Sequence, residues 1–190
     1  MRKFVASVLC TFMMVGFGAA EIGCSSPPPP KAPKVKHARV RKKPPQTNFE
    51  MVDNRIKLPG PVVFRTGSDD LDPVSDVVLE VVLDYMSAKK NVTLLRIEGH
   101  TDSDGSAGAN QALSEKRAMA VARWLADAGI DCRRLLPVGF GQTKPVAPND
   151  TSDNKAQNRR VAFVNAAIDG RSVGALGADG GGRVAGDPCR

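Results

Sequence analysis

Two stretches that cannot build a hydrophobic core leave residues 49–168 to form the folded part of this 190-residue chain. Residues 25–48 are rich in proline and lysine, so they favour an extended spacer whose like charges repel one another. Residues 169–190 are rich in glycine, which predicts a flexible tail. The remaining stretch of about 120 residues is long enough for one ordinary domain.

The formal net charge of +7 is concentrated outside this predicted domain. Nine of the 27 basic residues lie within the first 43 positions, where Glu21 is the one acid. Removing these ten residues leaves 18 basic and 19 acidic residues, so the rest of the chain is close to neutral. A protein that binds nucleic-acid phosphates needs its positive charge on the folded domain, and the sequence therefore disfavours that class.

The first 24 residues have the layout of a secretory signal. Basic residues precede an unbroken apolar run at residues 4–20, which is near the short limit for a membrane-spanning helix. Cys24 follows in a Gly-Cys-Ser-Ser context that resembles a bacterial lipobox, so we expect lipidation at Cys24. Glu21 departs from that pattern, and the small residues 18–20 leave ordinary signal cleavage open.

Two cysteines, Cys132 and Cys189, lie beyond the spacer. The oxidising compartment that an export signal implies would allow them to form a disulfide. Nothing in their spacing requires the bond, so the sequence leaves their pairing open.

Residues 49–168 alternate between predicted strands and helices. Runs of branched residues bounded by glycine or proline predict strands at residues 62–64, 92–98, 135–140 and 160–166. Apolar residues at helical spacing predict helices at about residues 73–85 and 106–128, and a long polar loop precedes the last strand. The order βαβαββ predicts an α/β sandwich (α+β), in which a mixed sheet carries the helices on one face.

The second predicted helix carries a charge on its apolar face. At 100° per residue, Arg117 and Asn110 fall in the same sector as Val121 and Trp124. Burying an unpaired arginine costs several kcal/mol, so an acidic side chain should lie near it. The nearest candidate is Asp102, which follows a predicted strand at the edge where α/β folds commonly bind ligands.

Asp102 and Arg117 could be arranged in two ways. They could pair directly as a structural salt bridge, or they could stand apart and bind a zwitterion. In the second arrangement Asp102 accepts the ammonium group, while Arg117 donates two parallel hydrogen bonds to the carboxylate. Spacing alone does not choose between them.

Four motifs occur in order around this pair: Gly-His-Thr-Asp at residues 99–102, Arg-Ala at 117–118, Gly-Phe-Gly at 139–141 and Asn-Arg-Arg-Val at 158–161. Together they resemble the OmpA-like C-terminal domain, which peptidoglycan-associated lipoproteins and flagellar stator proteins also carry. The resemblance covers nearly all of residues 49–168. It is far more specific than one short motif.

The resemblance implies non-catalytic binding of peptidoglycan, in which Asp102 and Arg117 hold the zwitterionic end of diaminopimelate. The other residues expected at this site are Thr101, Asn110, Arg159 and Arg160. It also implies a protein of the outer membrane that faces the periplasm and tethers that membrane to the cell wall. No cofactor or metal is expected.

Other functions fit the sequence less well. An envelope scaffold of the same fold, which binds periplasmic proteins and not the wall, is the main alternative. Catalysis is disfavoured because His100 is the sole histidine of the domain, and neither a nucleophile elbow nor a phosphate-binding glycine loop is present. His100 with the two nearby aspartates is a weak metal-binding set. Ala162 stands where the family often has a glutamate, which affects sheet packing more than the Asp102 site.

Overall fold

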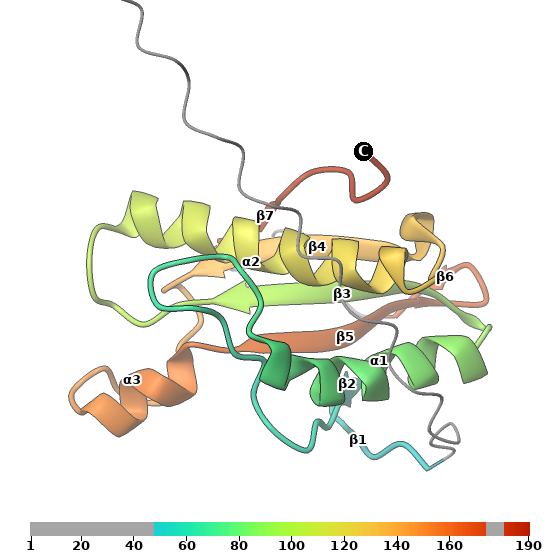
Figure 1. Cartoon of the computed structure of the whole chain (residues 1–190), viewed down its shortest axis with the longest axis horizontal. Coiled ribbons are helices and arrows are strands. Elements are labelled where there is room, and N and C mark those ends of the chain that lie inside the picture. The colour runs from blue at the N-terminus through green and yellow to red at the C-terminus, as the bar shows by residue number, and fades with distance from the viewer. Residues whose placement is uncertain (1–47, 174–180) are drawn as a thin grey trace, which may run out of the picture. The chain divides into compact units, whose positions relative to one another are not determined.

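The computed structural model describes residues 48–173 and 181–190 (Figure 1). The predicted signal, Cys24 and nearly all of the proline- and lysine-rich spacer lie outside these described residues. Within the described ranges, no helix has both the length and the apolar character needed to cross a membrane.

Helices and strands alternate along the domain, as the order of predicted elements required. The helices are α1 (Asp76–Ala88), α2 (Ala107–Asp127) and α3 (Ser152–Asn158), with short 3-10 helices η1 (Pro73–Ser75) and η2 (Cys132–Arg134). The long strands are β3 (Val92–His100), β4 (Leu135–Gly141) and β5 (Val161–Ile168). The short strands are β1 (Met51–Val52), β2 (Arg55–Ile56), β6 (Arg171–Ser172) and β7 (Arg183–Val184).

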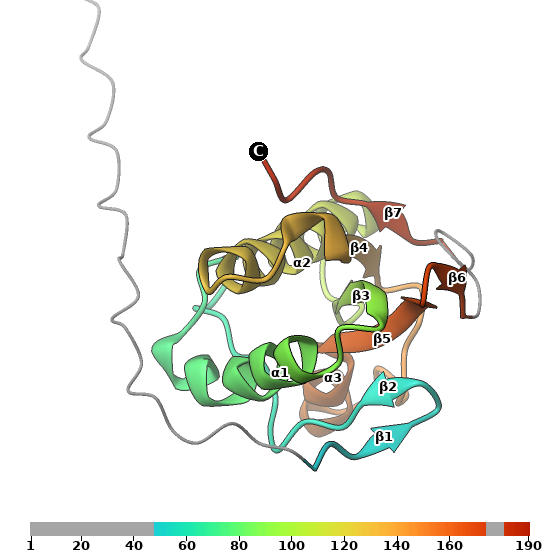
Figure 2. The same cartoon turned by 90° about the vertical axis from the view of Figure 1, so that its right-hand side faces the viewer.

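The strands form one mixed sheet in the order β1-β2-β5-β3-β4-β7, with β6 paired to β5. The β3 and β4 strands are parallel, and the other neighbours are antiparallel. Figure 2 shows α1 and α2 on the same face of this sheet, while α3 lies at the end where β3 finishes. The predicted α/β class with helices on one face is therefore confirmed.

A side chain caps the start of the helical segment at residues 73–88 and the start of α2. Asp72 accepts a hydrogen bond from the Val74 backbone N–H at the start of η1, and α1 follows directly. Ser106 caps α2 by accepting from the Ala109 N–H, and α2 ends just before Gly129, whose φ is 105°. The predicted helix at residues 106–128 is thus correct to within one residue at each end.

The hydrophobic core lies between these helices and the sheet. Its most buried residues include Leu79, Val82, Met86, Leu95, Ile97, Val121, Leu125 and Phe163. Gly99 allows α2 to approach β3 closely, because a Cβ there would collide with the Ser114 carbonyl of α2. This close approach holds the start of α2 against the end of β3.

Two details of the predicted order are wrong. Residues 62–64 do not form a strand; Phe64 makes one isolated bridge with Leu71, which closes a local loop. The first strands are instead β1 and β2, which are joined by a turn whose residues Asp53 and Asn54 have positive φ. The polar loop before β5 also contains α3, which begins where Thr151 accepts from the Asn154 N–H.

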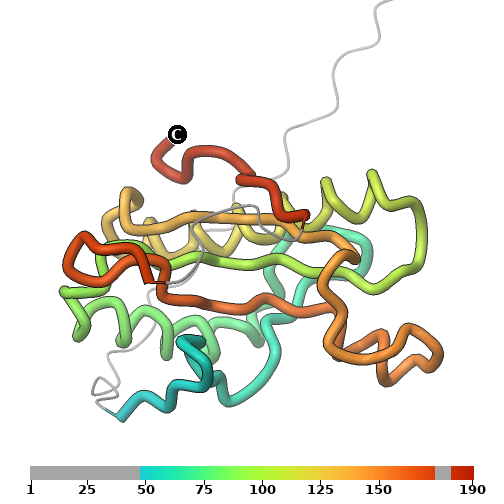
Figure 3. The backbone as a smooth tube through the Cα atoms, turned by 180° about the vertical axis from the view of Figure 1, so that it is seen from behind, coloured from blue at the N-terminus to red at the C-terminus, as the bar shows by residue number. Residues whose placement is uncertain are grey.

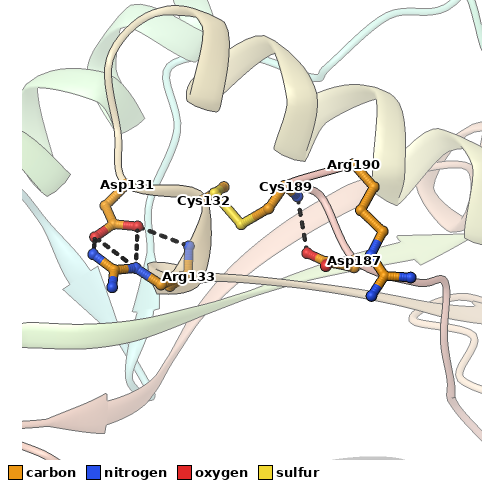
Figure 4. Close-up of a disulfide and its surroundings, with 6 residues drawn as sticks. All are labelled: Asp131, Cys132, Arg133, Asp187, Cys189 and Arg190. Carbon is orange, nitrogen blue, oxygen red and sulfur yellow. Dashed lines mark hydrogen bonds and ion pairs between the residues drawn. A yellow bond between two sulfur atoms is a disulfide. The ribbon is translucent and has the colours of Figure 1, made fainter.

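The C-terminal region is more structured than its glycine content suggested. Its described residues include β6 and β7 (Figure 3). β7 pairs with β4, and the Ala185 N–H donates to the carbonyl of Pro137 in β4. A disulfide joins Cys132 to Cys189, with their Cα atoms 5.3 Å apart (Figure 4). The two cysteines, whose pairing the sequence left open, are therefore bonded to each other.

Candidate functional site

Asp102 lies directly beyond the end of β3, where the backbone is fixed by its neighbours. The Thr101 N–H donates to the Gly141 carbonyl of β4, which continues the sheet past the last residue of β3. Asn110, in the second turn of α2, donates its side-chain amide to the carbonyls of Asp102 and Asp104. Thr101 and Asn110 therefore hold the loop that carries Asp102 in place.

The Asp102 carboxylate pairs with Arg159. The Arg159 Nη1 donates to Asp102 Oδ2 at 2.6 Å, and the Asp104 backbone N–H donates to Asp102 Oδ1 at 3.1 Å. Asp102 is only 7% exposed, whereas the Arg159 side chain is 45% exposed. The carboxylate is thus fixed from the protein side, while its partner can reorient into solvent.

Arg117 stands apart from this ion pair and is held by the loop before α1. Its Nε donates to the Ser68 carbonyl at 3.1 Å, and its guanidinium lies 4.9 Å from the centre of the Phe64 ring. Within the described residues, its two terminal nitrogens make no hydrogen bond. The direct Asp102–Arg117 salt bridge, one of the two arrangements considered, is therefore not the one observed.

The charges of both members of the ion pair act on Arg117. Burial lowers the pKa of the Arg117 guanidinium, and the positive charge of Arg159 lowers it further, while Asp102 and Asp69 raise it. The site therefore combines two guanidinium groups with the Asp102 carboxylate. Such a set suits a ligand that carries a carboxylate and an ammonium group close together.

The segment after β4 supports the loop that carries Asp102. The buried Asn158 side chain accepts from the Val146 N–H and donates to the side-chain oxygen Oδ1 of Asn149, which also accepts from the Ser103 N–H. From α3, Lys155 forms a 2.8 Å ion pair with Asp104. These contacts fix Arg159, which follows α3, opposite the Asp102 loop.

Arg160, which is also expected at this site, makes no hydrogen bond or ion pair with Asp102 within the described residues. Its guanidinium donates to the carbonyls of Asn158 and Lys144. Burial lowers the pKa of Arg160, followed by the charge of Arg55, whereas Glu98 raises it. These neighbours lie on the sheet face away from α1 and α2, because successive strand residues alternate between faces.

Sequence reasoning missed the residues that hold Arg117. The contact of Phe64 could have been predicted in part, because a large apolar residue in a polar loop usually packs against another side chain. Ser68 carried no signal in the sequence, because it contributes its backbone carbonyl and any residue could do so. Lys155 was missed together with α3.

The chain matches known proteins across this region. The OmpA family matches residues 63–159. The outer-membrane lipoprotein YfiB of Pseudomonas aeruginosa is 33% identical over 144 residues, which cover 75% of this chain and 83% of that protein. The peptidoglycan-binding protein ArfA of Mycobacterium tuberculosis is 36% identical over 105 residues, which cover 55% of this chain and 32% of ArfA.

Solved structures agree with the sheet and helices described above. The peptidoglycan-associated lipoprotein from Burkholderia pseudomallei has a TM-score of 0.50 and 32% sequence identity, and the match covers 54% of this chain and 86% of that structure. The arrangement of the elements is thus shared with this structure. The chain belongs to the OmpA family.

Proposed function

We propose that this protein binds peptidoglycan non-covalently and tethers the outer membrane to the cell wall. The observation that carries the proposal is the arrangement of Asp102 and Arg117. The Asp102 carboxylate is fixed at the end of β3, and Arg117 on α2 is half-buried with its terminal nitrogens unpaired within the described residues. Two opposite charges held apart in this way suit a zwitterion.

Diaminopimelate of the peptide stem supplies such a zwitterion. Its carboxylate would accept two parallel hydrogen bonds from the terminal nitrogens of Arg117. Its ammonium group would donate to Asp102, which has about four acceptor positions and can therefore keep its bond to Arg159. Because two guanidiniums face one carboxylate, the site carries an excess positive charge that favours the acidic wall polymer.

The names of two relatives support this proposed role. ArfA is named as peptidoglycan-binding and YfiB as an outer-membrane lipoprotein, and both are at least 33% identical to this chain. The match covers only 32% of ArfA, so the proposal concerns the shared domain and no other part of ArfA.

The N-terminal segments would place the domain within reach of the wall. We propose that residues 1–24 direct export, that Cys24 carries the lipid anchor and that residues 25–48 act as the spacer. At about 3.1 Å per residue, an extended polyproline II spacer of this length would reach roughly 75 Å. This length would allow the domain to search a layer away from its membrane.

Sedimentation with insoluble peptidoglycan sacculi tests the proposal on the full chain in nonionic detergent. Wild type should pellet, whereas Asp102→Asn and Arg117→Gln should each bind at least about tenfold more weakly, because each removes the group that would bind one charge of the zwitterion and leaves that charge unpaired in the complex. Arg123→Gln, on the exposed side of the same helix, is the matched control for the loss of an arginine. Unchanged binding by a folded Arg117→Gln protein would rule out this site.

Competition tests the ligand itself. Free diaminopimelate should release the protein from sacculi, whereas pimelate, which lacks both ammonium groups, should not. Release by both compounds would show that Asp102 takes no part in recognition. If wild type does not pellet at all, the function moves to an envelope scaffold of the same fold.

A further inference from the structure

A separate group of charged side chains lies on the sheet face opposite α1 and α2. On β3, Leu95 and Ile97 face the helices, so Arg96, Glu98 and His100 face the other way. These three polar residues are 8%, 1% and 1% exposed, respectively. Such complete burial of charged residues requires compensating partners.

Glu98 is the acid of this group, and one arginine already neutralises it. Arg96 Nη2 lies 2.7 Å from Glu98 Oε1, and both side chains are buried. Burial opposes ionisation of Glu98, yet its pKa is lowered overall by His100, Arg96 and Arg55. Glu98 and Arg96 therefore form a charged pair with no net charge.

Two further guanidinium groups surround this pair. Arg55 Nη2 lies 3.9 Å from Glu98 Oε2, too far for a hydrogen bond. Arg160 is half-buried and close enough to Arg55 for the two positive charges to disfavour each other. Ala162, the residue opposite Glu98 on β5, adds no acid. After Arg96 has paired with Glu98, the described residues leave two positive charges here.

His100 adds a hydrogen-bond donor to the same place. Its ring stacks on Phe140 with centroids 5.3 Å apart, and Glu98 Oε2 lies 3.5 Å from Nε2. Within the described ranges, neither ring nitrogen has a hydrogen-bond partner that meets ordinary geometry. Burial lowers the pKa of His100, so the ring is neutral at pH 7 and keeps one N–H group. Buried donors of this kind normally have an acceptor.

We propose that Arg55 and Arg160 bind a phosphate group on this face of the sheet, with His100 as a third donor. Inorganic phosphate or a phosphate monoester carries about 1.5 to 2 negative charges at pH 7, which matches the two excess positive charges of this group better than a single carboxylate does. Its oxygens also fit the paired donors of a guanidinium. The Arg55 side chain is 47% exposed, which gives a ligand access from solvent.

Titration calorimetry on the full chain in nonionic detergent tests this site with two probes. Inorganic phosphate represents a free anion, and glycerol 3-phosphate, which is also a monoester, represents the headgroup of an anionic lipid with a terminal phosphate. Wild type should bind at least one probe, and Arg55→Gln and Arg160→Gln should each bind it at least about tenfold more weakly. The matched control is Arg133→Gln, which removes an exposed arginine from η2 and should bind like wild type.

The outcomes show whether the site exists and, if it does, whether its phosphate comes from a free anion or from a lipid. Binding of inorganic phosphate alone supports a free anion, and tighter binding of the headgroup supports a lipid surface. No heat with either probe, or unchanged affinity in both variants, overturns the proposal. Arg55 is half-exposed, so Arg55→Gln should fold even if Arg160→Gln does not. Sacculus binding by Arg55→Gln should remain at the wild-type level, which keeps this test independent of the Asp102 site.

Discussion

Asp102 and Glu98 are four residues apart in the chain, and both are nearly buried carboxylates that pair with arginine. Their partners differ. Arg96, which pairs with Glu98, has a side chain only 10% exposed, whereas Arg159, which pairs with Asp102, is 45% exposed. Glu98 lies inside the sheet with neighbours on both sides, while Asp102 has passed the end of β3 and meets loops. The Asp102 carboxylate can therefore reach a ligand because it lies beyond the end of β3, whereas Glu98 is enclosed by the neighbouring strands.

The two ion pairs should also differ in how much stability is lost when each is broken. A buried pair is strongly destabilising to break, because removing one partner leaves the other charge in a medium of low dielectric. A pair whose arginine can turn into water loses much less. We therefore expect the Glu98 group to determine stability and the Asp102 group to determine binding.

Glu98→Gln should give the largest loss of stability. Without the carboxylate, Arg96, Arg55 and Arg160 keep their charges and lose the acid between them, which should cost about 3–5 kcal/mol of unfolding free energy. Urea unfolding followed by circular dichroism measures this value.

The matched comparison is Asp102→Asn, which also removes one negative charge near β3. Its loss of unfolding free energy should be only about 1 kcal/mol, because Arg159 can move into solvent. Its sacculus binding should nevertheless be lost. Equal losses of unfolding free energy in Glu98→Gln and Asp102→Asn would contradict the assignment of stability to the Glu98 group and of binding to the Asp102 group.

Replacing both cysteines of the disulfide by serine should have the next largest effect. Cys132 and Cys189 are 57 residues apart in sequence, and closing a loop of that size stabilises the folded state by about 2–4 kcal/mol. The bond is made at η2, before β4 begins, whereas Asp102 follows the other end of the parallel strand β3, so sacculus binding should be unchanged. Thermal unfolding of the double variant and of reduced wild type should agree, and loss of wall binding on reduction would link the tail to the site.

The sequence predicted those parts of the fold that depend on local pattern. The strand at residues 92–98 and the helix at residues 106–128 were predictable because alternation, helical spacing, Ser106 and Gly129 all agreed. The failed strand at residues 62–64 shows the limit, since its apolar residues serve a loop that closes on Leu71. The ordered residues near Cys189 depend on a bond between positions 57 residues apart, which local pattern does not reveal.

The site was predictable in part for the same reason. The position of Arg117 on an apolar helix face, together with Asp102 after a strand, pointed to two residues of the candidate site, whose role in binding stays a prediction. Arg159 and Arg160 were indistinguishable in sequence, because they are adjacent and chemically identical. Only the start of β5 decides that Arg159 meets Asp102 while Arg160 joins Glu98 on the other face.

The Glu98 group should also make stability depend on pH through His100. Burial lowers the pKa of His100 below 6.5, so the unfolded chain binds a proton more readily than the folded one. Stability should therefore be complete above pH 6.5 and decrease as the pH falls toward the folded-state pKa. Glu98, whose pKa is lowered from 4.5, adds a loss of the same sign at more acidic pH.

Urea unfolding between pH 5 and 7 checks this dependence. His100→Asn should flatten the slope, because it removes the titrating ring. His37→Ala, which replaces the other histidine of the chain, is the control and should keep the wild-type slope. A slope unchanged in His100→Asn would assign the effect to another group.

The smallest effect should come from a charge pair that is exposed on both sides. Arg133 donates to both oxygens of Asp131 and lowers the pKa of that carboxyl to about 2, yet the Arg133 side chain is 83% exposed. Arg133→Gln should raise the pKa of Asp131 toward 3.8, as measured by NMR titration, and leave the melting temperature unchanged because solvent already screens the pair. A clear fall in melting temperature would mean that an exposed ion pair with a shifted pKa also stabilises the fold. Burial would then no longer explain why replacing Glu98 should cost more unfolding free energy than replacing Asp102.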